Sequence, residues 1–433
     1  MNLHRTKMIV AFLMASIDLS RRTFLAGTAA TLLTPSMARA QANERIQIGV
    51  IGYGKRTGPV LRNALREGAV QVTALCEIEG TRLEAGKKAV EVGYGKEKKS
   101  ASFKGCAAYV DYREMLEKEQ LDAVVIMTPD HMHVHPSLAA IAKGCDVYCE
   151  KPLTQNIAEG RLLAEAVRKA GTVFQTGSQQ RSEYAGRFRR AVELVWAGRI
   201  GDVKKIHVGV GGPPIPCDLP TEDLPNNVDW ELWLGPAPMR GYNEILCPKG
   251  IHNHYPQFRK YQEYAGGGLA DMGAHHFDIA QWGIGMDASG PVSVTPPKEG
   301  ESGLKFTYEN GVEMFHGGFS GTTFEGTEGT IQVGRGSLKV SPKKLMEEEL
   351  PKNAKRVTSS NNHFTNWVEC IKSREDPICP AEIGHRTATV CHLANIGYKL
   401  RRELKWDPKK EEFVGDAEAN ALRSRKPRDG WSY

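Results

Sequence analysis

The chain has 433 residues, of which 40% are hydrophobic and 25% are charged, and its formal net charge at pH 7 is +6. This is the composition of an ordinary globular protein, which excludes disordered and fibrous classes, and the length suffices for two domains with separate cores. No basic run carries interleaved aromatic residues, so nucleic acid is not expected as a partner. The nine cysteines include no CxxC pair, so neither a disulfide scaffold nor a zinc ribbon is expected, and Cys145 and Cys149 are expected to be buried free thiols.

The first 40 residues have the features of an export signal. An arginine pair, Arg21 and Arg22, precedes a short apolar run, and Ala38 and Ala40 form a small-x-small cleavage pattern. These features predict a twin-arginine signal over residues 1–40, with an apolar run shorter than the roughly 20 residues that span a bilayer. We therefore expect the twin-arginine export machinery as a partner, a periplasmic or otherwise exported location, and no stable membrane insertion. A misassigned cytoplasmic leader is the alternative.

Residues 44–178 have the pattern of a dinucleotide-binding domain. A strand over residues 45–51 is followed by the glycine-rich turn Gly52-Tyr53-Gly54 and by a helix over residues 58–65. In such a fold the first glycine permits the tight turn, the second lets the backbone approach the pyrophosphate, and the phosphate charge meets the helix amino terminus. The third glycine of the usual GxGxxG pattern is displaced to Gly58, which predicts a wider loop.

The second strand, residues 71–76, ends at Glu77. A carboxylate at this position accepts hydrogen bonds from ribose hydroxyls and repels a 2′-phosphate, which favours NAD over NADP. Arg56 in the glycine-rich loop and Arg82 nearby keep NADP open as the alternative. We expect the cofactor to be held tightly, because the twin-arginine route carries folded proteins into a compartment without a free nicotinamide pool. Such a cofactor must be re-oxidised or re-reduced in place, so we infer a second substrate or an internal hydride return.

A third apolar strand, residues 121–127, suits a parallel strand covered on both faces. The loop that begins with Thr128 and Pro129 follows at the carboxyl edge, where open α/β sheets bind ligands. Histidines alternate from His131 to His135 in an HxHxH pattern. On a loop entering a helix this spacing converges poorly, and no carboxylate or cysteine completes the set, so no metal is expected.

The functional centre is predicted at Lys151. It follows an apolar strand over residues 146–150 that ends in Glu150. A lysine just beyond a strand end, at the mouth of a nucleotide crevice, can bond a substrate hydroxyl and stabilise the alkoxide that forms as hydride leaves. Pro152 comes next and allows a cis peptide bond. The alternative is a surface lysine in a loop.

Residues 179–405 predict a second domain, followed by a charged tail over residues 406–433. Alternation of apolar and polar residues replaces the continuous apolar runs, which predicts a mostly antiparallel sheet. Strands are expected around residues 203–210, 303–308, 312–319 and 329–340, and helices over residues 363–373 and 380–400.

The strongest motif of the second domain is the run from Gly266 to His275. Its three leading glycines let the backbone approach a ligand, and a helix follows. Asp271 and His275 are four residues apart, so they share a helix face. Imidazole titrates near neutrality, so His275 can take a hydroxyl proton while Asp271 orients the substrate or the imidazole. A helix-capping aspartate with a packed histidine is the alternative.

The glycine-rich turn, the strand that ends in Glu150-Lys151-Pro152, and the run from Gly266 to His275, in this order, resemble the Gfo/Idh/MocA family of sugar and cyclitol oxidoreductases. The resemblance extends from about Glu44 to the last residues. It implies an α/β fold with an N-terminal Rossmann dinucleotide-binding domain and a C-terminal α+β domain that has a large, mainly antiparallel open sheet. Because this sheet commonly pairs subunits in the family, a homo-oligomer, either a dimer or a tetramer, is expected.

The resemblance also implies roles for individual residues. It gives Lys151, Asp271 and His275 the catalytic positions, and it places Asp130 where the family usually has asparagine. The expected cofactor contacts are Gly52, Tyr53, Gly54, Arg56, Glu77, Thr128, Pro129, His133, Glu150 and Lys151. The expected substrate contacts are Lys151, Arg181, Asp271 and His275.

Together these features predict an exported NAD(P)-dependent oxidoreductase that transfers hydride from a ring carbon of a sugar, glycoside or inositol to a nicotinamide. His275 would be the base, Lys151 would stabilise the oxyanion, and Asp271 would position the hydroxyl. A redox-neutral glycoside hydrolase or lyase working through a transient keto-sugar stays open, since the same residues would serve it. The glycosidase relatives carry a different histidine motif, which argues mildly against that reading. A non-catalytic periplasmic sugar- or nucleotide-binding protein is a third reading, disfavoured because the three catalytic residues occur together.

Overall fold

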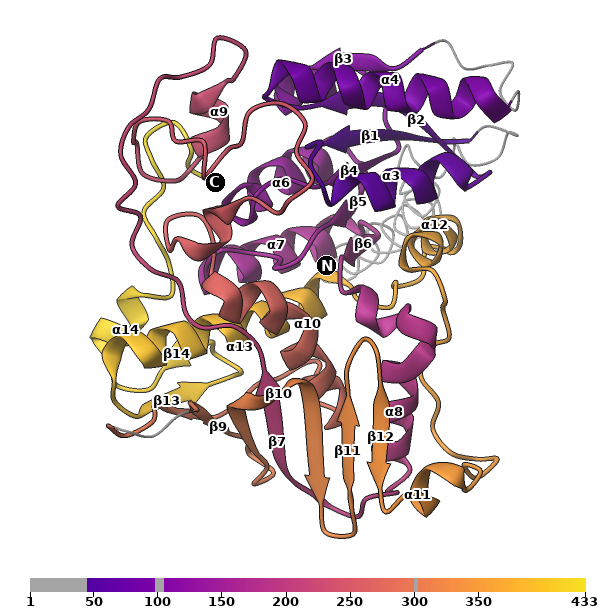
Figure 1. Ribbon diagram of the computed structural model, residues 1–433, viewed down its shortest axis with the longest axis vertical. Coiled ribbons are helices and arrows are strands. Elements are labelled where there is room, and N and C mark those ends of the chain that lie inside the picture. Colours follow the sequence, from indigo (N-terminus) through magenta and orange to yellow (C-terminus); the bar gives the residue numbers. More distant parts are fainter. Residues whose placement is uncertain (1–44, 98–104, 300–302) are drawn as a thin grey trace, which may run out of the picture. The chain divides into compact units, whose positions relative to one another are not determined.

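One parallel and one antiparallel sheet organise the chain (Figure 1). The computed structural model describes residues 45–97, 105–299 and 303–433, which belong to a single unit, Arg45–Tyr433. The predicted twin-arginine signal over residues 1–40 lies outside these ranges. In the ranges described, we find no helix whose length and apolar character would let it span a bilayer.

The first sheet has six parallel strands in the order β3-β2-β1-β4-β5-β6. The strands are β1 (Ile46–Ile51), β2 (Val70–Cys76), β3 (Ala107–Tyr109), β4 (Ala123–Ile126), β5 (Asp146–Cys149) and β6 (Phe174–Thr176). The helices between them are α3 (Thr57–Arg66), α4 (Gly80–Glu97), α5 (Tyr112–Lys118), α6 (Val134–Ala142) and α7 (Ile157–Ala170). The strand order reverses between β1 and β4, where doubly wound sheets bind nucleotides. The predicted Rossmann fold is confirmed.

The apolar run of β4 shows why this sheet forms. Successive side chains of a strand point to opposite faces. Val124 and Ile126 join one hydrophobic core, whereas Ala123 and Val125 join the core on the other face. All four are at most 2% exposed. A strand buried on both faces therefore has to be apolar at every position, as the sequence is.

The second sheet is antiparallel throughout and has eight strands, in the order β12-β11-β10-β9-β8-β13-β14 with β7 paired to β10. The strands are β7 (Val203–Gly209), β8 (Ser293–Thr295), β9 (Lys305–Thr307), β10 (Glu313–Gly326), β11 (Thr330–Val333), β12 (Leu338–Ser341), β13 (Leu404–Asp407) and β14 (Glu412–Phe413). Its helices are α8 (Arg187–Trp196), α9 (Trp230–Leu234), α10 (Gly267–Gly283), α11 (Lys344–Glu347), α12 (His363–Ser373), α13 (Ala381–Leu400) and α14 (Ala417–Ala421). The expected antiparallel sheet is confirmed, but the single strand expected around residues 329–340 is the hairpin β11–β12.

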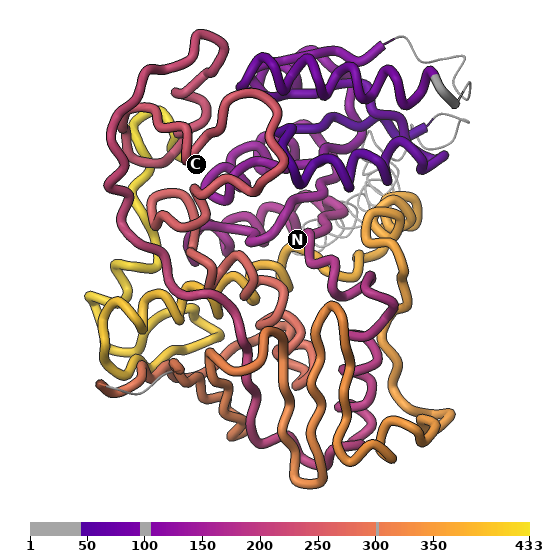
Figure 2. The backbone as a smooth tube through the Cα atoms, viewed as in Figure 1, coloured from indigo at the N-terminus to yellow at the C-terminus, as the bar shows by residue number. Residues whose placement is uncertain are grey.

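The C-terminal half also completes the parallel sheet's cores. Trp367 of α12 is fully buried in the core shared with β1, and its Nε1 donates to the oxygen of Val173 at 3.3 Å. Trp431 joins the core on the opposite face, and its oxygen lies 2.8 Å from Nε2 of His135. Residues 406–433, expected as a tail, therefore belong to the fold, and Figure 2 shows this last segment beside the loops around residue 235, where Arg428 donates to the oxygen of Gly235 at 3.0 Å.

Candidate active site

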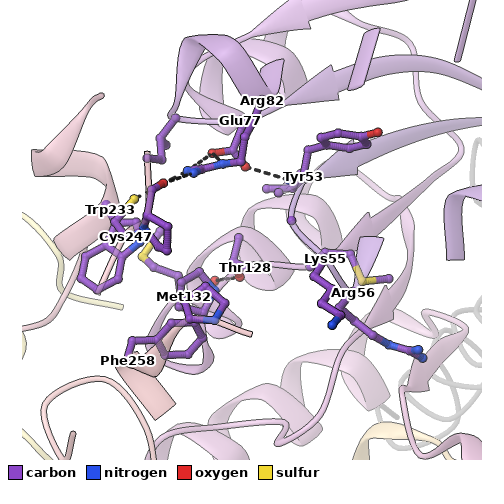
Figure 3. A pocket seen from close by; sticks show the side chains of 18 of the residues that line it. Tyr53, Lys55, Arg56, Glu77, Arg82, Thr128, Met132, Trp233, Cys247 and Phe258 are labelled. Atoms are coloured by element: carbon purple, nitrogen blue, oxygen red, sulfur yellow. Dashed lines mark hydrogen bonds and ion pairs between the residues drawn. The ribbon is translucent and has the colours of Figure 1, made fainter. Parts of the chain in front are cut away.

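A pocket with about 920 Å³ of empty space lies at the carboxyl ends of β1, β2 and β4 (Figure 3). The second domain closes its other side with a segment that contributes Cys247, Tyr255 and Arg259. The expected cofactor contacts that line it are Gly52, Tyr53, Gly54, Arg56, Glu77, Thr128 and Pro129.

The glycine-rich turn fits the pyrophosphate of a dinucleotide. Gly52 has a φ of 91°, and a Cβ there would stand 2.8 Å from the oxygen of Met127, so only glycine fits. Thr57, which begins α3, bridges the turn through its hydroxyl, which donates to the oxygen of Gly52 at 3.0 Å and accepts from the nitrogen of Gly54 at 3.1 Å. The hydroxyl of Thr57 thus holds together the two ends of the turn, in which the third glycine of the usual pattern is displaced.

Glu77 is held by an arginine. Its Oε2 accepts from the nitrogen of Tyr53 at 2.7 Å, and its Oε1 accepts from Nη2 and Nε of Arg82 at 2.8 and 3.1 Å (Figure 3). Arg82 also donates from Nη1 to the oxygen of Pro248 at 2.6 Å. Both partners of this ion pair are buried. The carboxylate that we expect to contact a ribose is therefore connected, through Arg82, to the segment that covers the pocket.

Lys151 and Asp271 meet although they come from different domains. Nζ of Lys151 donates to Oδ1 and to the main-chain oxygen of Asp271, both at 2.8 Å. The expected cis bond between Lys151 and Pro152 is present. Asp271 lies in the second turn of α10, whose glycine start allows close backbone packing. A Cβ on Gly267, with a φ of 73°, would stand 2.4 Å from the nitrogen of Pro214.

His275 lies one turn after Asp271 and is 3% exposed. Its Nδ1 has no hydrogen-bond partner among the described residues. Burial, with the charges of Lys151 and Arg335, holds the pKa of His275 well below its usual range. Burial acts to raise the pKa of Asp271, but Lys151 and Arg259 outweigh it and lower that pKa. At neutral pH the site therefore combines a neutral imidazole with an ionised carboxylate.

Three of the expected cofactor contacts do not line the pocket, namely Lys151, Glu150 and His133. Oε1 of Glu150, a buried residue, accepts from Nε of Arg56 at 2.8 Å, so it anchors a pocket arginine. The buried ring of His133 lies between two carbonyls, with Nδ1 2.7 Å from the oxygen of Pro152 and Nε2 3.0 Å from the oxygen of Thr128. Both residues position the groups around them, and neither lines the pocket.

The expected contact between Arg181 and a substrate is not supported. Arg181 is 1% exposed, and its Nη2 lies 2.7 Å from Oδ1 of Asp278 and 2.7 Å from Oδ1 of Asp287. Its guanidinium also stacks over Trp282, 4.7 Å from the ring centroid. A buried guanidinium that is matched by two carboxylates is a structural ion pair, which holds α10 to the segment after β6.

The three alternating histidines do not converge on a metal. Nε2 of His131 is 2.8 Å from the oxygen of Trp233, and His133 and His135 likewise bond to backbone carbonyls. No group of three or more histidine, cysteine, aspartate or glutamate side chains is arranged to hold a metal in residues 45–97, 105–299 and 303–433.

Sequence reasoning missed three site residues. Arg259 lines the pocket, with Nε 3.6 Å from Oδ1 of Asp271. Burial raises the pKa of Asp130 to about 7, opposed by Arg259 and reinforced by Asp271. Arg335, at the turn between β11 and β12, donates from Nε to Oε1 of Gln180 at 3.0 Å. Of the three, only Asp130 carried a signal, as an aspartate where the family usually has asparagine.

The switch-point pocket and the adjacent lysine, aspartate and histidine define a dinucleotide-dependent oxidoreductase site. The chain matches the oxidoreductase family's NAD-binding Rossmann fold over residues 46–178 and its C-terminal alpha/beta domain over residues 216–433. The chain therefore belongs to the Gfo/Idh/MocA oxidoreductase family.

Three known proteins illustrate the relationship. The chain is 26% identical over 309 residues to 1,5-anhydro-D-fructose reductase of Ensifer adhaerens, a match that covers 68% of this chain and 77% of the reductase. It is 28% identical over 262 residues to a glycosyl hydrolase family 109 protein of Stenotrophomonas maltophilia, covering 54% of each. The WlbA dehydrogenase from Bordetella pertussis, solved in complex with NADH and UDP-GlcNAcA, shares the fold with a TM-score of 0.58 and 15% identity, over 84% of this chain and 99% of that one.

Proposed function

We propose that the protein oxidises or reduces a ring carbon of a sugar, glycoside or cyclitol with a bound nicotinamide cofactor. The observation that carries the proposal is the contact between Lys151 and Asp271, 2.8 Å long, one helical turn before a buried histidine with a free ring nitrogen. When bound, the nicotinamide supplies the hydride acceptor or donor.

The protein's own groups handle the proton and the charge. The ring of His275 takes the proton of the ring hydroxyl, because the low pKa of this imidazole keeps it neutral at pH 7. Lys151 donates to the same oxygen and stabilises the charge that develops on it, an interaction of the kind that contributes ~10²–10³-fold to a rate. Asp271 holds the ammonium in place.

The proposed cofactor is NAD, with NADP as the alternative, and we propose that it stays bound through turnover. Oε2 of Glu77 is free to accept one more hydrogen bond, and repulsion of a 2′-phosphate favours NAD. Arg82 supports retention, because it connects Glu77 to the covering segment at Pro248. The same arginine weakens the repulsion, which keeps NADP as the alternative.

A redox-neutral route, in which oxidation is followed by elimination of a substituent and return of hydride, is the second candidate. One observation favours it: the carboxyl of Asp130 has a pKa of about 7 and feels the charges of Lys151 and Asp271, so it can supply a proton near neutral pH. The similarity to a glycosyl hydrolase family 109 protein is consistent with this route.

We also propose export by the twin-arginine route and assembly into a homo-oligomer. The export proposal rests on Arg21 and Arg22. Replacing both by lysine should leave the protein in the cytoplasm, and unchanged fractionation would contradict the proposal. Assembly rests on the open antiparallel sheet, and light scattering on the mature protein would test it: a monomer would refute it.

The deciding experiment uses mature protein purified without added nucleotide. We expect denaturation to release a stoichiometric nicotinamide nucleotide, identified by mass, and sugars or inositols to change its absorbance in the intact protein. A keto-product formed together with an equivalent amount of reduced nicotinamide points to the first function, whereas cleaved glycoside with unchanged cofactor redox state points to the second. A protein that is empty and ignores added NAD and NADP would instead be a binding protein.

A further inference from the structure

Arg335 is a cation without an anionic partner. It is exposed at the turn between β11 and β12, and within the described residues it forms no ion pair. Its Nε is occupied by Oε1 of Gln180, and its guanidinium lies 4.9 Å from the ring centroid of Tyr184. Both Nη atoms have no partner in the part of the chain that is described. The guanidinium is thus anchored through one nitrogen, and its two other nitrogens remain available to a ligand.

A short chain of contacts connects this guanidinium to the base. Gln180, which is fully buried, accepts from Arg335 and donates from Nε2 to the main-chain oxygen of His275 at 3.2 Å. The charge of Arg335 lowers the pKa values of both His275 and Asp271, so it acts on the groups proposed to carry the chemistry. Arg335 is therefore a fixed part of the site.

The other cations around the site each have a carboxylate partner, whereas Arg335 has none among the described residues. Lys151 and Arg259 share one carboxylate, that of Asp271. Glu150 is matched by Arg56, and Glu183, whose pKa burial raises, forms no ion pair with Arg335. A neutral substrate would leave Arg335 without an ion-pair partner.

An arginine held by one nitrogen, with two others free, matches the bidentate geometry of a carboxylate or a phosphate. We propose that the substrate is an acidic sugar or cyclitol derivative whose carboxylate or phosphate ester binds Arg335 while its reacting hydroxyl lies at Lys151 and His275. This inference rests on the proposed function and specifies its substrate class.

The test compares matched ligand pairs on the cofactor-loaded protein. The probes are hexuronates against the corresponding hexoses, and glucose 6-phosphate against glucose, with binding followed by calorimetry and reduction by nicotinamide absorbance. We expect one acidic series to exceed its neutral partner in kcat/KM by ~10–100-fold, as a hydrogen-bonded charge pair would give. The series with the larger increase in kcat/KM over its neutral partner shows whether the anionic group of the substrate is a carboxylate or a phosphate.

Arg335→Gln should abolish this preference, so that the ratio of kcat/KM for the acidic ligand to that for its neutral partner falls to about one, while Arg335→Lys should keep part of it. Lys339→Gln, on the exposed surface of the same hairpin, is the matched control and should change nothing. Equal use of acidic and neutral ligands by the parent, or a preference that survives Arg335→Gln, would overturn the inference.

The two failures can be told apart. If neutral sugars reduce the cofactor and acids have no advantage, the substrate class is wrong and the proposed function stands. If acids bind in an Arg335-dependent manner but no ligand changes the cofactor, the anion site stands and the proposed oxidoreductase function is wrong.

Discussion

Lys151 donates two hydrogen bonds of 2.8 Å to Asp271, one to its carboxylate and one to its main-chain oxygen. The second bond fixes the ammonium relative to the backbone of α10 itself. Because Lys151 follows β5 whereas Asp271 and His275 lie on α10, these two bonds connect the parallel sheet directly to the helix that carries the proposed base.

Replacing Lys151 with alanine should lower turnover by ~10²–10³-fold, because the group that stabilises the oxyanion is lost. Bound nucleotide should be retained, since Lys151 does not line the nucleotide pocket. Steady-state kinetics and nucleotide content per chain measure the two effects. The exposed Lys143→Ala serves as a control that should match the parent. Unchanged turnover in Lys151→Ala would contradict the proposed mechanism.

The pH dependence of kcat/KM should report the titration of His275. Burial and the charges of Lys151 and Arg335 lower its pKa, so the acidic limb of kcat/KM should lie below the ordinary value of 6.5. Removing the positive charge in Arg335→Gln stabilises the imidazolium and raises this pKa, so the limb should move to higher pH. A profile measured with a neutral sugar isolates this effect from substrate charge. A limb that stays in place would mean that His275 is not the base.

Asp130 should make stability depend on pH. Its carboxyl has a folded pKa of about 7 against an ordinary 3.8, so between these values the folded protein keeps a proton that the unfolded chain releases. Raising the pH through this window therefore destabilises the fold. Asp130→Asn removes this titration. The melting temperature of the variant should therefore rise relative to that of the parent as the pH increases from 5 to 8. Asp218→Asn, in an exposed loop, should show no such trend.

Arg82→Met should destabilise the protein by about 3–5 kcal/mol, because Glu77 is left as a buried, unpaired carboxylate. The double variant Glu77→Gln with Arg82→Met should recover part of that loss, and urea denaturation of the parent, Arg82→Met, Glu77→Gln and the double variant gives the coupling. Arg82→Met and the double variant should also release nucleotide faster than the parent during dialysis, because both lack the hydrogen bond from Arg82 to Pro248. Retention equal to that of the parent would show that Arg82 does not hold the covering segment.

Local sequence patterns predicted the features that depend on neighbours in the chain. The uninterrupted apolar run of β4 follows from burial on two faces, and the spacing of Asp271 and His275 follows from helix geometry. The turn that begins at Gly52 needs a positive φ that only glycine adopts easily.

The features missed depend on partners far along the chain. Arg181 is neutralised by Asp278 and Asp287, about a hundred residues later, so its sequence context could not distinguish a substrate contact from a structural ion pair. Arg335 enters the site only because a turn splits the strand expected over residues 329–340. Its contact with Gln180 spans 155 residues. No local pattern encodes such a pairing.

The two tryptophans that complete the cores of the parallel sheet come late in synthesis. Trp367 fills one face and Trp431, two residues from the end, fills the other. Residues 46–178 leave the ribosome before either tryptophan is made, so the nucleotide-binding domain completes its two cores only after Trp431 has been added. Although Trp431 is far from the pocket in sequence, Trp431→Ala should therefore weaken nucleotide binding.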